Sequence, residues 1–246
     1  MTLFQNLVDE VFITLIPGSD PLKTIPAIKQ VHEAGFLAVP HVTARGFQSL
    51  AQLNDFFSAT RELGVQKALI LAGGLGQPAG PFTESLDLLK TESLQNAGLQ
   101  TIAFAGHPEG NPEDPESWAN LLQKKAFLDE TKLNMEIVTQ WSFSPDAVSN
   151  YISRLRSQGI QAPVKAGIAG PSSLKTLLKY AKTCGVTAAK EVLRKQGFNL
   201  GRLLMSNNPQ ETVRSIQGTP HFHLYPFGGL QKSAKWLQEQ RQSLAA

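Results

Sequence analysis

The sequence is poor in the features that mark secreted, membrane-spanning and nucleic-acid-binding proteins. One cysteine, Cys184, among 246 residues excludes an internal disulfide and a cysteine-rich metal site. The longest apolar run, 68–72, falls far short of the roughly 20 residues that a membrane helix needs. No run of like charges occurs, the net charge is only +3, and no secretory signal begins the chain. We therefore expect a soluble, cytoplasmic protein that binds neither membranes nor nucleic acid.

The sequence has instead a regular alternation of short apolar runs with helical patterns, without a break in composition. Strands are expected at 11–16, 36–39, 67–72, 100–105, 135–140, 163–168 and 221–225. Helices are expected at 21–34, 47–63, 83–96, 116–130, 188–196 (after a less distinct strand) and 229–240. Two more are expected, one that begins at Ser144-Pro145 and one that follows 170–172 and ends at Cys184. This alternation predicts an α/β protein of parallel βαβ units, and the length favours a single (β/α)8 TIM barrel over residues 1–246. A doubly wound open sheet is the alternative.

In such a barrel, ligands bind to the loops that follow the strands. Polar or glycine-rich groups stand at four of these places: PHVTAR (40–45), the glycine turn 73–80, GHPEGNPE (106–113) and TQW (139–141). Each has a structural alternative, namely a solvent-facing Arg45, simple turn geometry, a stiff surface turn and a tryptophan that closes the barrel. His221 and His223 alternate on one strand, and without further matching ligands they indicate structural histidines rather than a metal site.

Seven segments, in chain order, together resemble the methylenetetrahydrofolate reductase family. They are FITLIPGSD (12–20), PHVTAR (40–45), LILAGG (69–74), AGHPEGNPE (105–113), IVTQWSF (137–143), AGIAGP (166–171) and HFHLYPF (221–227). Members of this family are TIM barrels in which a flavin takes a hydride from a reduced nicotinamide and passes it to 5,10-methylenetetrahydrofolate. The resemblance implies the same fold and reaction class here, with NAD(P)H as the hydride source, tetrahydrofolate as the substrate scaffold and FAD left open.

The resemblance also implies roles for individual residues. Catalytic proton chemistry is expected from Glu109, His107 or Glu113. Substrate contacts are expected from Thr14, Gln140, Trp141 and Phe143, with the Gln140 amide facing the pterin. Cofactor contacts are expected from His41, Thr43, Gly73, Gly74, Asn111 and Lys125 (or its neighbour Lys124).

Two departures from the family pattern change this expectation. Thr14 stands where the family carries a glutamate, the presumed acid, and Gly74 stands where an acidic residue is thought to tune the flavin. Since a threonine cannot donate a proton as a carboxylic acid does, we predict a divergent reductase that uses another acid and either a flavin or direct hydride transfer. The alternatives are a folate-binding barrel with a transfer or demethylation-linked role, and an inactive partner subunit. A homo-oligomer is left open.

Overall fold

A computed structural model describes residues 2–184, 186, 206–207 and 209–245 of the chain. These residues form two compact units. Unit 1 comprises Met1–Ala105 and Gln123–Glu136, and unit 2 comprises Gly106–Leu122 and Ile137–Ala246. The chain thus passes from one unit to the other within two strands and one helix. A single domain over residues 1–246 stays a prediction.

The strands of the main sheet are parallel and follow one another in chain order. They are β1 (Glu10–Ile13), β2 (Leu37–Thr43), β3 (Lys67–Leu71), β4 (Thr101–Gly106), β5 (Asn134–Thr139), β6 (Val164–Ala169) and β9 (His221–Tyr225). The order in the sheet is β1-β2-β3-β4-β5-β6-β9. In unit 1, His41 pairs with Leu69 and Thr43 with Leu71. In unit 2, Gly167 pairs with His223.

This strand order confirms the prediction of a parallel α/β protein. It contains no reversal of the kind that a doubly wound sheet requires, so that alternative is wrong for these strands. Seven parallel strands in sequential order are consistent with a TIM-barrel-like fold. An eighth parallel strand and a closed barrel are not found among the described residues, where the remaining pair, β7 (Ser172–Ser173) with β8 (Ser206–Asn207), is antiparallel. The helix expected at 188–196 lies outside the described residues.

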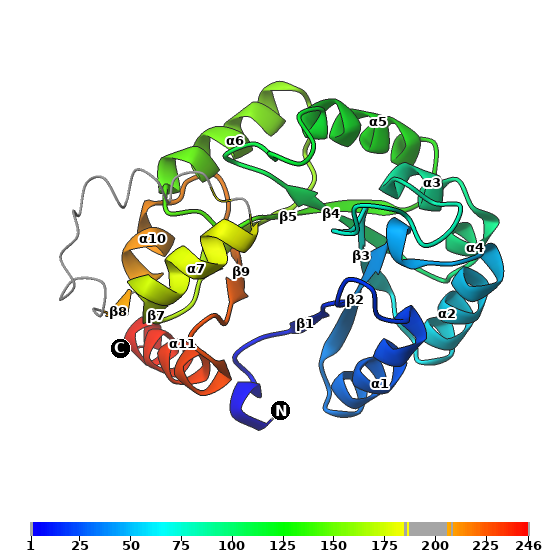
Figure 1. Cartoon of the computed structure of the whole chain (residues 1–246). Coiled ribbons are helices and arrows are strands. Elements are labelled where there is room, and N and C mark those ends of the chain that lie inside the picture. The colour runs from blue at the N-terminus through cyan, green and yellow to red at the C-terminus, as the bar shows by residue number, and fades with distance from the viewer. Residues whose placement is uncertain (1, 185, 187–205, 208, 246) are drawn as a thin grey trace. The chain divides into compact units, whose positions relative to one another are not determined.

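The helices of unit 1 flank its strands. They are η1 (Thr2–Phe4), η2 (Pro21–Thr24), α1 (Ile25–Glu33), η3 (Ala44–Gly46), α2 (Leu50–Glu62), α3 (Ser85–Leu89) and α4 (Glu92–Gln95). Helix α1 packs on β2, and α2 packs beside α1 and α4 (Figure 1). The single helix predicted over 83–96 is wrong because Thr91 begins a new helix there: its hydroxyl accepts a hydrogen bond from the backbone of Leu94 at 3.2 Å.

Further helices follow in the rest of the chain. They are α5 (Ser117–Asp129), which belongs to both units, and α6 (Pro145–Ser157), α7 (Leu174–Cys184), α10 (Pro209–Ser215) and α11 (Leu230–Ala245) of unit 2. Helix α6 begins as predicted, since the Ser144 hydroxyl accepts from the Ala147 amide at 3.2 Å and Pro145 takes the first position. None of the described helices is long and apolar enough to cross a membrane.

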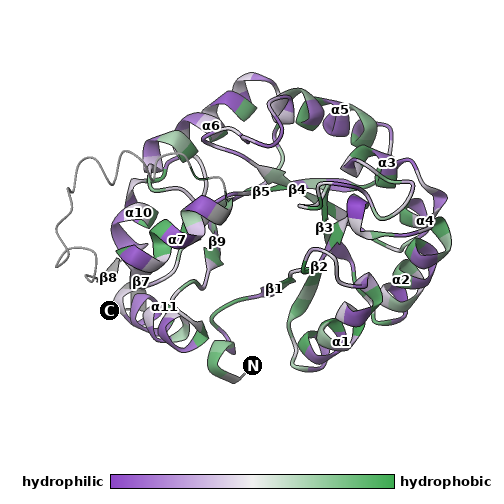
Figure 2. Ribbon diagram, in the orientation of Figure 1, coloured by the Kyte–Doolittle hydropathy of each residue, from purple (hydrophilic) through white to green (hydrophobic). Residues whose placement is uncertain are grey.

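The core of unit 1 lies between its strands and helices. Val39, Ile70 and Ile102 contribute fully buried strand side chains, and Phe47 and Phe56 meet edge to face at 5.5 Å. In Figure 2 the ribbon of β3 is coloured as apolar, whereas α1 and α2 alternate between apolar and polar residues. This pattern is expected of a strand buried on both faces and of helices with one face in solvent.

Candidate functional site

The predicted site residues are divided between the two units. Unit 1 holds Thr14, His41, Thr43, Gly73, Gly74 and Lys125. Unit 2 holds His107, Glu109, Asn111, Glu113, Gln140, Trp141 and Phe143. Each set is described below within its own unit.

In unit 2, the loop after β4 is folded by its own polar groups. The amide of Gly110 donates to the His107 carbonyl at 3.0 Å, and the Asn111 side-chain oxygen accepts from the Glu113 amide at 3.1 Å. The Asp114 carboxylate accepts from the Glu116 amide at 3.1 Å and from the Asn120 side chain, so it secures the start of α5. These hydrogen bonds agree with the structural alternative of a stiff surface turn, and Asn111 takes part in one of them.

Glu109 is the carboxylate of this loop that meets the loop after β5. It is partly buried and accepts a hydrogen bond from the Ser142 hydroxyl, whereas Glu113 is exposed. Ser142 is 6% exposed, and the backbone amide of Ser144 donates to its hydroxyl oxygen at 2.8 Å. Ser142 was absent from the sequence-based site, although it lies within the IVTQWSF segment. The structure thus joins one predicted proton donor to a residue two positions from Gln140.

Gln140 directly follows β5, and both the oxygen and the nitrogen of its side-chain amide already make hydrogen bonds. Its backbone amide donates to the Gly106 carbonyl at 2.7 Å and fixes the start of the loop. The side-chain oxygen accepts from the Trp141 amide at 3.1 Å, and the side-chain nitrogen donates to the Cys184 carbonyl at 3.4 Å. The second contact is long for a hydrogen bond, so a ligand with a better-placed acceptor can replace it at low cost.

Aromatic residues pack beside Gln140 in unit 2. Trp141 is 1% exposed and contacts Phe143 at 5.0 Å and Phe227 at 5.2 Å between ring centroids. Tyr225 stacks on Phe227 and donates its hydroxyl to the Thr139 carbonyl at 3.1 Å. Burial, with a smaller contribution from Cys184, raises the pKa of Tyr225, so its hydroxyl stays protonated. Trp141 is thus a core residue, and its contact with substrate stays a prediction.

In unit 1, His41 and Thr43 lie on β2 in an uncharged setting. The His41 ring meets Phe12 edge to face at 6.2 Å, and burial lowers the pKa of His41 to about 4, so the imidazole is neutral at pH 7. A Cβ on Gly73 would lie 3.0 Å from the Thr43 Cβ, and one on Gly46 would lie 2.6 Å from the Thr43 hydroxyl. Gly73 also has a φ of +98°, so its backbone and its packing on Thr43 both favour glycine.

The Arg45 side chain is hydrogen-bonded to the backbone of the glycine-rich turn and does not simply face solvent. Its guanidinium donates to the Leu75 carbonyl and to the Thr83 carbonyl, each at 3.0 Å. Its backbone amide donates to the Ala72 carbonyl at 2.9 Å. Arg45 therefore connects the end of β2 with both ends of the 73–83 segment, a role that its position in the PHVTAR motif did not reveal.

The remaining unit 1 candidates have few features of a ligand site. Thr14 is exposed just after β1. Lys125 pairs with Asp129 one turn along α5, at 2.6 Å. A Cβ on Gly74 would meet only Pro17, at 3.8 Å, so the space beside Gly74 admits a side chain. Among the described residues, no group of three His, Cys, Asp or Glu is placed to hold a metal ion.

The residues assigned to the cofactor include few cations for the charged end of a flavin. A flavin dinucleotide presents two phosphates, which proteins bind with cations and uncommitted N–H groups. Among these residues only Lys125 and its alternative Lys124 are cations. Lys125 pairs with Asp129, and the Lys124 ammonium lies 5.6 Å from the centroid of the Phe104 ring. His41 is neutral at pH 7, and the Asn111 side-chain oxygen is used within its own loop. We therefore derive no step of the reaction through a flavin.

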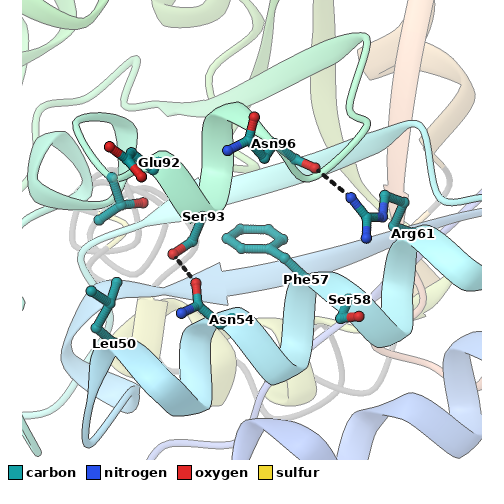
Figure 3. A pocket seen from close by; sticks show the side chains of 9 residues that line it. Leu50, Asn54, Phe57, Ser58, Arg61, Glu92, Ser93 and Asn96 are labelled. Carbon is teal, nitrogen blue, oxygen red and sulfur yellow. Dashed lines mark hydrogen bonds between the residues drawn. The ribbon is translucent and has the colours of Figure 1, made fainter.

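A separate groove of about 360 Å³ lies between α2 and α4 of unit 1 (Figure 3). Phe57 lines it, the Ser93 hydroxyl donates to the Asn54 side chain, and the Arg61 guanidinium donates to the Asn96 carbonyl at 3.3 Å. None of its residues belongs to the predicted site.

Comparisons with known proteins point to one family. The family model for methylenetetrahydrofolate reductase matches residues 9–199. A probable methylenetetrahydrofolate reductase (NADH) of Oryza sativa subsp. japonica is 23% identical over 211 residues, covering 74% of this chain and 34% of the relative. A probable methylenetetrahydrofolate reductase (NADPH) of Caenorhabditis elegans is 24% identical over 189 residues, covering 72% of this chain and 28% of the relative. The chain spans about a third of the length of these curated relatives.

Matching solved structures include the carboxyl transferase domain from Rhizobium etli pyruvate carboxylase with 3-bromopyruvate. It is 14% identical, with a TM-score of 0.41, and the match covers 95% of this chain and 40% of that one. The family model is the stronger finding, because its match covers most of the chain and includes six of the seven segments identified in the sequence. The chain belongs to the methylenetetrahydrofolate reductase family.

Proposed function

We propose that this protein reduces 5,10-methylenetetrahydrofolate to 5-methyltetrahydrofolate with NAD(P)H as the source of the hydride. The match of the family model to residues 9–199 carries the proposal. The relatives from rice and from the nematode are named for NADH and NADPH respectively, so either nicotinamide is a reasonable donor. The hydrogen bond from Ser142 to Glu109 supports it, because it brings a carboxyl group to the loop that carries Gln140.

The reaction needs an acid before it needs a hydride. The methylene carbon bridges N5 and N10 of the folate, and protonation of N10 allows the bond from N10 to this carbon to break. The product is a 5-iminium cation, whose carbon then accepts the hydride to become a methyl group. One proton and one hydride are consumed for each folate, and NAD(P)⁺ is released. The protein must therefore bind the pterin, deliver a proton and bring the nicotinamide to the same carbon.

Glu109 and Gln140 are the residues that we assign to the first two tasks. Glu109 has the carboxyl group that Thr14 lacks, and its contact with Ser142 fixes it to the loop that follows β5. Gln140 can pair with the pterin once its nitrogen leaves the Cys184 carbonyl, because an amide offers both a donor and an acceptor. His107 and Glu113 remain candidates of the same loop, and Glu113 is the more exposed of the carboxylates.

The experiment is an anaerobic assay on the purified protein with 5,10-methylenetetrahydrofolate and NADH or NADPH, with and without added FAD. Loss of nicotinamide absorbance and formation of 5-methyltetrahydrofolate, identified by mass, are measured together. We expect product only when both substrates are present. The same assay on a Gln140→Ala variant should show a rise in KM for the folate.

The outcomes separate the alternatives. Product formed without bound or added flavin means direct hydride transfer, whereas strict dependence on FAD means that a flavin carries the hydride. Binding of tetrahydrofolate without reduction would contradict the proposal and favour the transfer or demethylation-linked role. Absence of both binding and reduction would favour the inactive partner subunit.

A further inference from the structure

Ser142 is one of the buried hydroxyl residues of unit 2, and its hydroxyl contacts a carboxylate. It is a buried hydroxyl, 6% exposed, in a loop where the neighbouring buried side chain is the large aromatic Trp141. Its hydroxyl contacts three groups: the Glu109 carboxylate, the Ser144 amide at 2.8 Å and the Ser144 carbonyl at 3.3 Å. A buried hydroxyl needs one or two partners, so the full set indicates a residue whose position is strongly determined.

The Ser144 amide fixes the Ser142 oxygen from the backbone. Ser144 is itself the N-cap of α6, where its hydroxyl accepts from the Ala147 amide. The N-terminus of α6, a helix of 13 residues, therefore determines where the Ser142 hydroxyl lies. Because Glu109 stands on a loop from a different strand, its contact with Ser142 transfers that rigidity to the carboxylate.

The same hydroxyl can pair with Glu109 in both protonation states. A serine hydroxyl has one hydrogen and two lone pairs, and the Ser144 amide occupies one lone pair. When Glu109 is ionised, the hydroxyl hydrogen points to the carboxylate. When Glu109 carries a proton, that proton can point to the free lone pair while the hydroxyl hydrogen turns to the Ser144 carbonyl. A general acid needs such a partner, because it must keep its place before and after it gives up its proton.

We infer that Ser142 is a positioning residue that holds Glu109 beside the folate-binding loop through the catalytic cycle. The inference rests on the proposed function. It assigns no contact with substrate to Ser142, which acts through Glu109. Its removal should therefore lower the rate of the proton-dependent step and leave folate binding by Gln140 nearly unchanged.

The first test is kinetic. Ser142→Ala should lower kcat by roughly 10- to 100-fold, the range expected when a hydrogen bond to a charged group is lost, and should change the KM for the folate by less than about twofold. Ser142→Thr, which keeps the hydroxyl, should recover most of the rate. In a Glu109→Gln background, adding Ser142→Ala should lower kcat by less than about a further twofold, since Ser142 acts through Glu109. A matched control is Ser93→Ala, whose hydroxyl likewise donates to a side chain but lines the α2–α4 groove.

The second test does not need turnover. The carboxyl carbon of Glu109, observed by ¹³C NMR and assigned with Glu109→Gln, should shift in Ser142→Ala and stay in place in Ser93→Ala. An unchanged resonance overturns the inference, as does a Ser142→Ala enzyme with normal kcat or one that Ser142→Thr does not rescue. If the wild-type protein shows no reductase activity while the resonance still shifts, the contact is real. The proposed function then fails, and the positioning role fails with it.

Discussion

At the scale of single residues, three carboxylates that follow β4 differ in their surroundings although they stand close together in the sequence. Asp114 secures the first turn of α5, and Glu113 is exposed. Glu109 is partly buried and bound by Ser142. A proton donor must be held where the substrate binds, so this difference in position, rather than the shared chemistry of the group, distinguishes Glu109.

Glu109→Gln removes the acid and keeps the size of the side chain. We expect kcat for methylenetetrahydrofolate reduction to fall by about 10²–10⁴-fold, the usual contribution of a general acid. Glu113→Gln, in the same loop but exposed, should change kcat by less than about threefold. Steady-state assays of both variants measure the two effects. Equal losses, or a larger loss in Glu113→Gln, would contradict the assignment.

His41 makes the stability of the folded chain depend on pH. Burial lowers the pKa of His41 to about 4 from its ordinary value of 6.5, so below pH 6.5 the unfolded chain takes up a proton that the folded chain does not. The free energy of unfolding therefore keeps its full value above pH 6.5. It falls as the pH is lowered toward 4, by at most about 3 kcal/mol. Urea unfolding at pH 7 and at pH 4.5 should show this loss in the wild-type protein and a smaller one in His41→Gln. Equal pH dependence in the two proteins would exclude His41 as the cause.

The sequence predicted where Gln140 lies in the fold but could not reveal the partners of Ser142 and Arg45. Resemblance placed Gln140 at a strand end, and the structure has it there, because the motif and the end of β5 coincide. Trp141, its neighbour, points into the core because successive side chains of an extended segment face opposite ways. Ser142 and Arg45 are defined by partners 33 and 30 residues away in the chain, which no local pattern reports.

At the scale of elements, Arg45 determines the shape of the turn that carries Gly73 and Gly74. Arg45→Ala removes two hydrogen bonds from a charged donor to backbone carbonyls and should lower the free energy of unfolding by about 1–2 kcal/mol. It should also speed proteolysis within 73–83, because the turn loses its cross-connection to β2. Arg45→Lys should not restore stability, since a lysine lacks the planar fork that reaches two acceptors. Arg61→Ala is the control, because its exposed guanidinium makes one long bond to a carbonyl.

Element boundaries show where local sequence signals suffice. The start of α6 followed from Ser144 and Pro145, since a cap and a first-turn proline act locally. Strand β9 matches its predicted range of 221–225. In contrast, β1 ends at Ile13, three residues before the predicted end, because its last ladder partner is Pro40 of β2. An apolar run can continue past the point where the neighbouring strand stops pairing, so composition alone overestimates strand length.

At the scale of the whole molecule, the alternation of strands and helices predicted the order of the sheet. Sequential parallel order arises when each crossover places the next strand beside the last. Closure of a barrel is a different matter, since it requires pairing between the first and last strands, which the sequence does not encode in any local motif. The closed eight-stranded barrel therefore stays a prediction.

Long-range order in unit 1 also depends on a group of charges that sequence patterns did not reveal. Lys67 at the start of β3 contacts Glu10 of β1 at 2.6 Å and Glu136 of β5 at 2.9 Å. All three side chains are less than a fifth exposed. Burial alone would lower the pKa of Lys67, but the two carboxylates outweigh it and raise the pKa, so the ammonium stays charged. One cation thus joins three strands that are far apart in the chain.

Lys67→Met tests what this cation contributes. Removing it leaves two carboxylates in a poorly solvated place, so we expect the free energy of unfolding at pH 7 to fall by about 3–5 kcal/mol. The comparison is Lys29→Met, which breaks an ion pair with Glu33 whose side chains are about 60% exposed and should cost less than about 0.5 kcal/mol. Urea unfolding of the three proteins measures both values. Lowering the pH to protonate the carboxylates should recover part of the loss in Lys67→Met, because neutral carboxyl groups are cheaper to bury. A Lys67→Met protein as stable as Lys29→Met would show that the two carboxylates are well solvated and that the cation adds little to the stability of the strands.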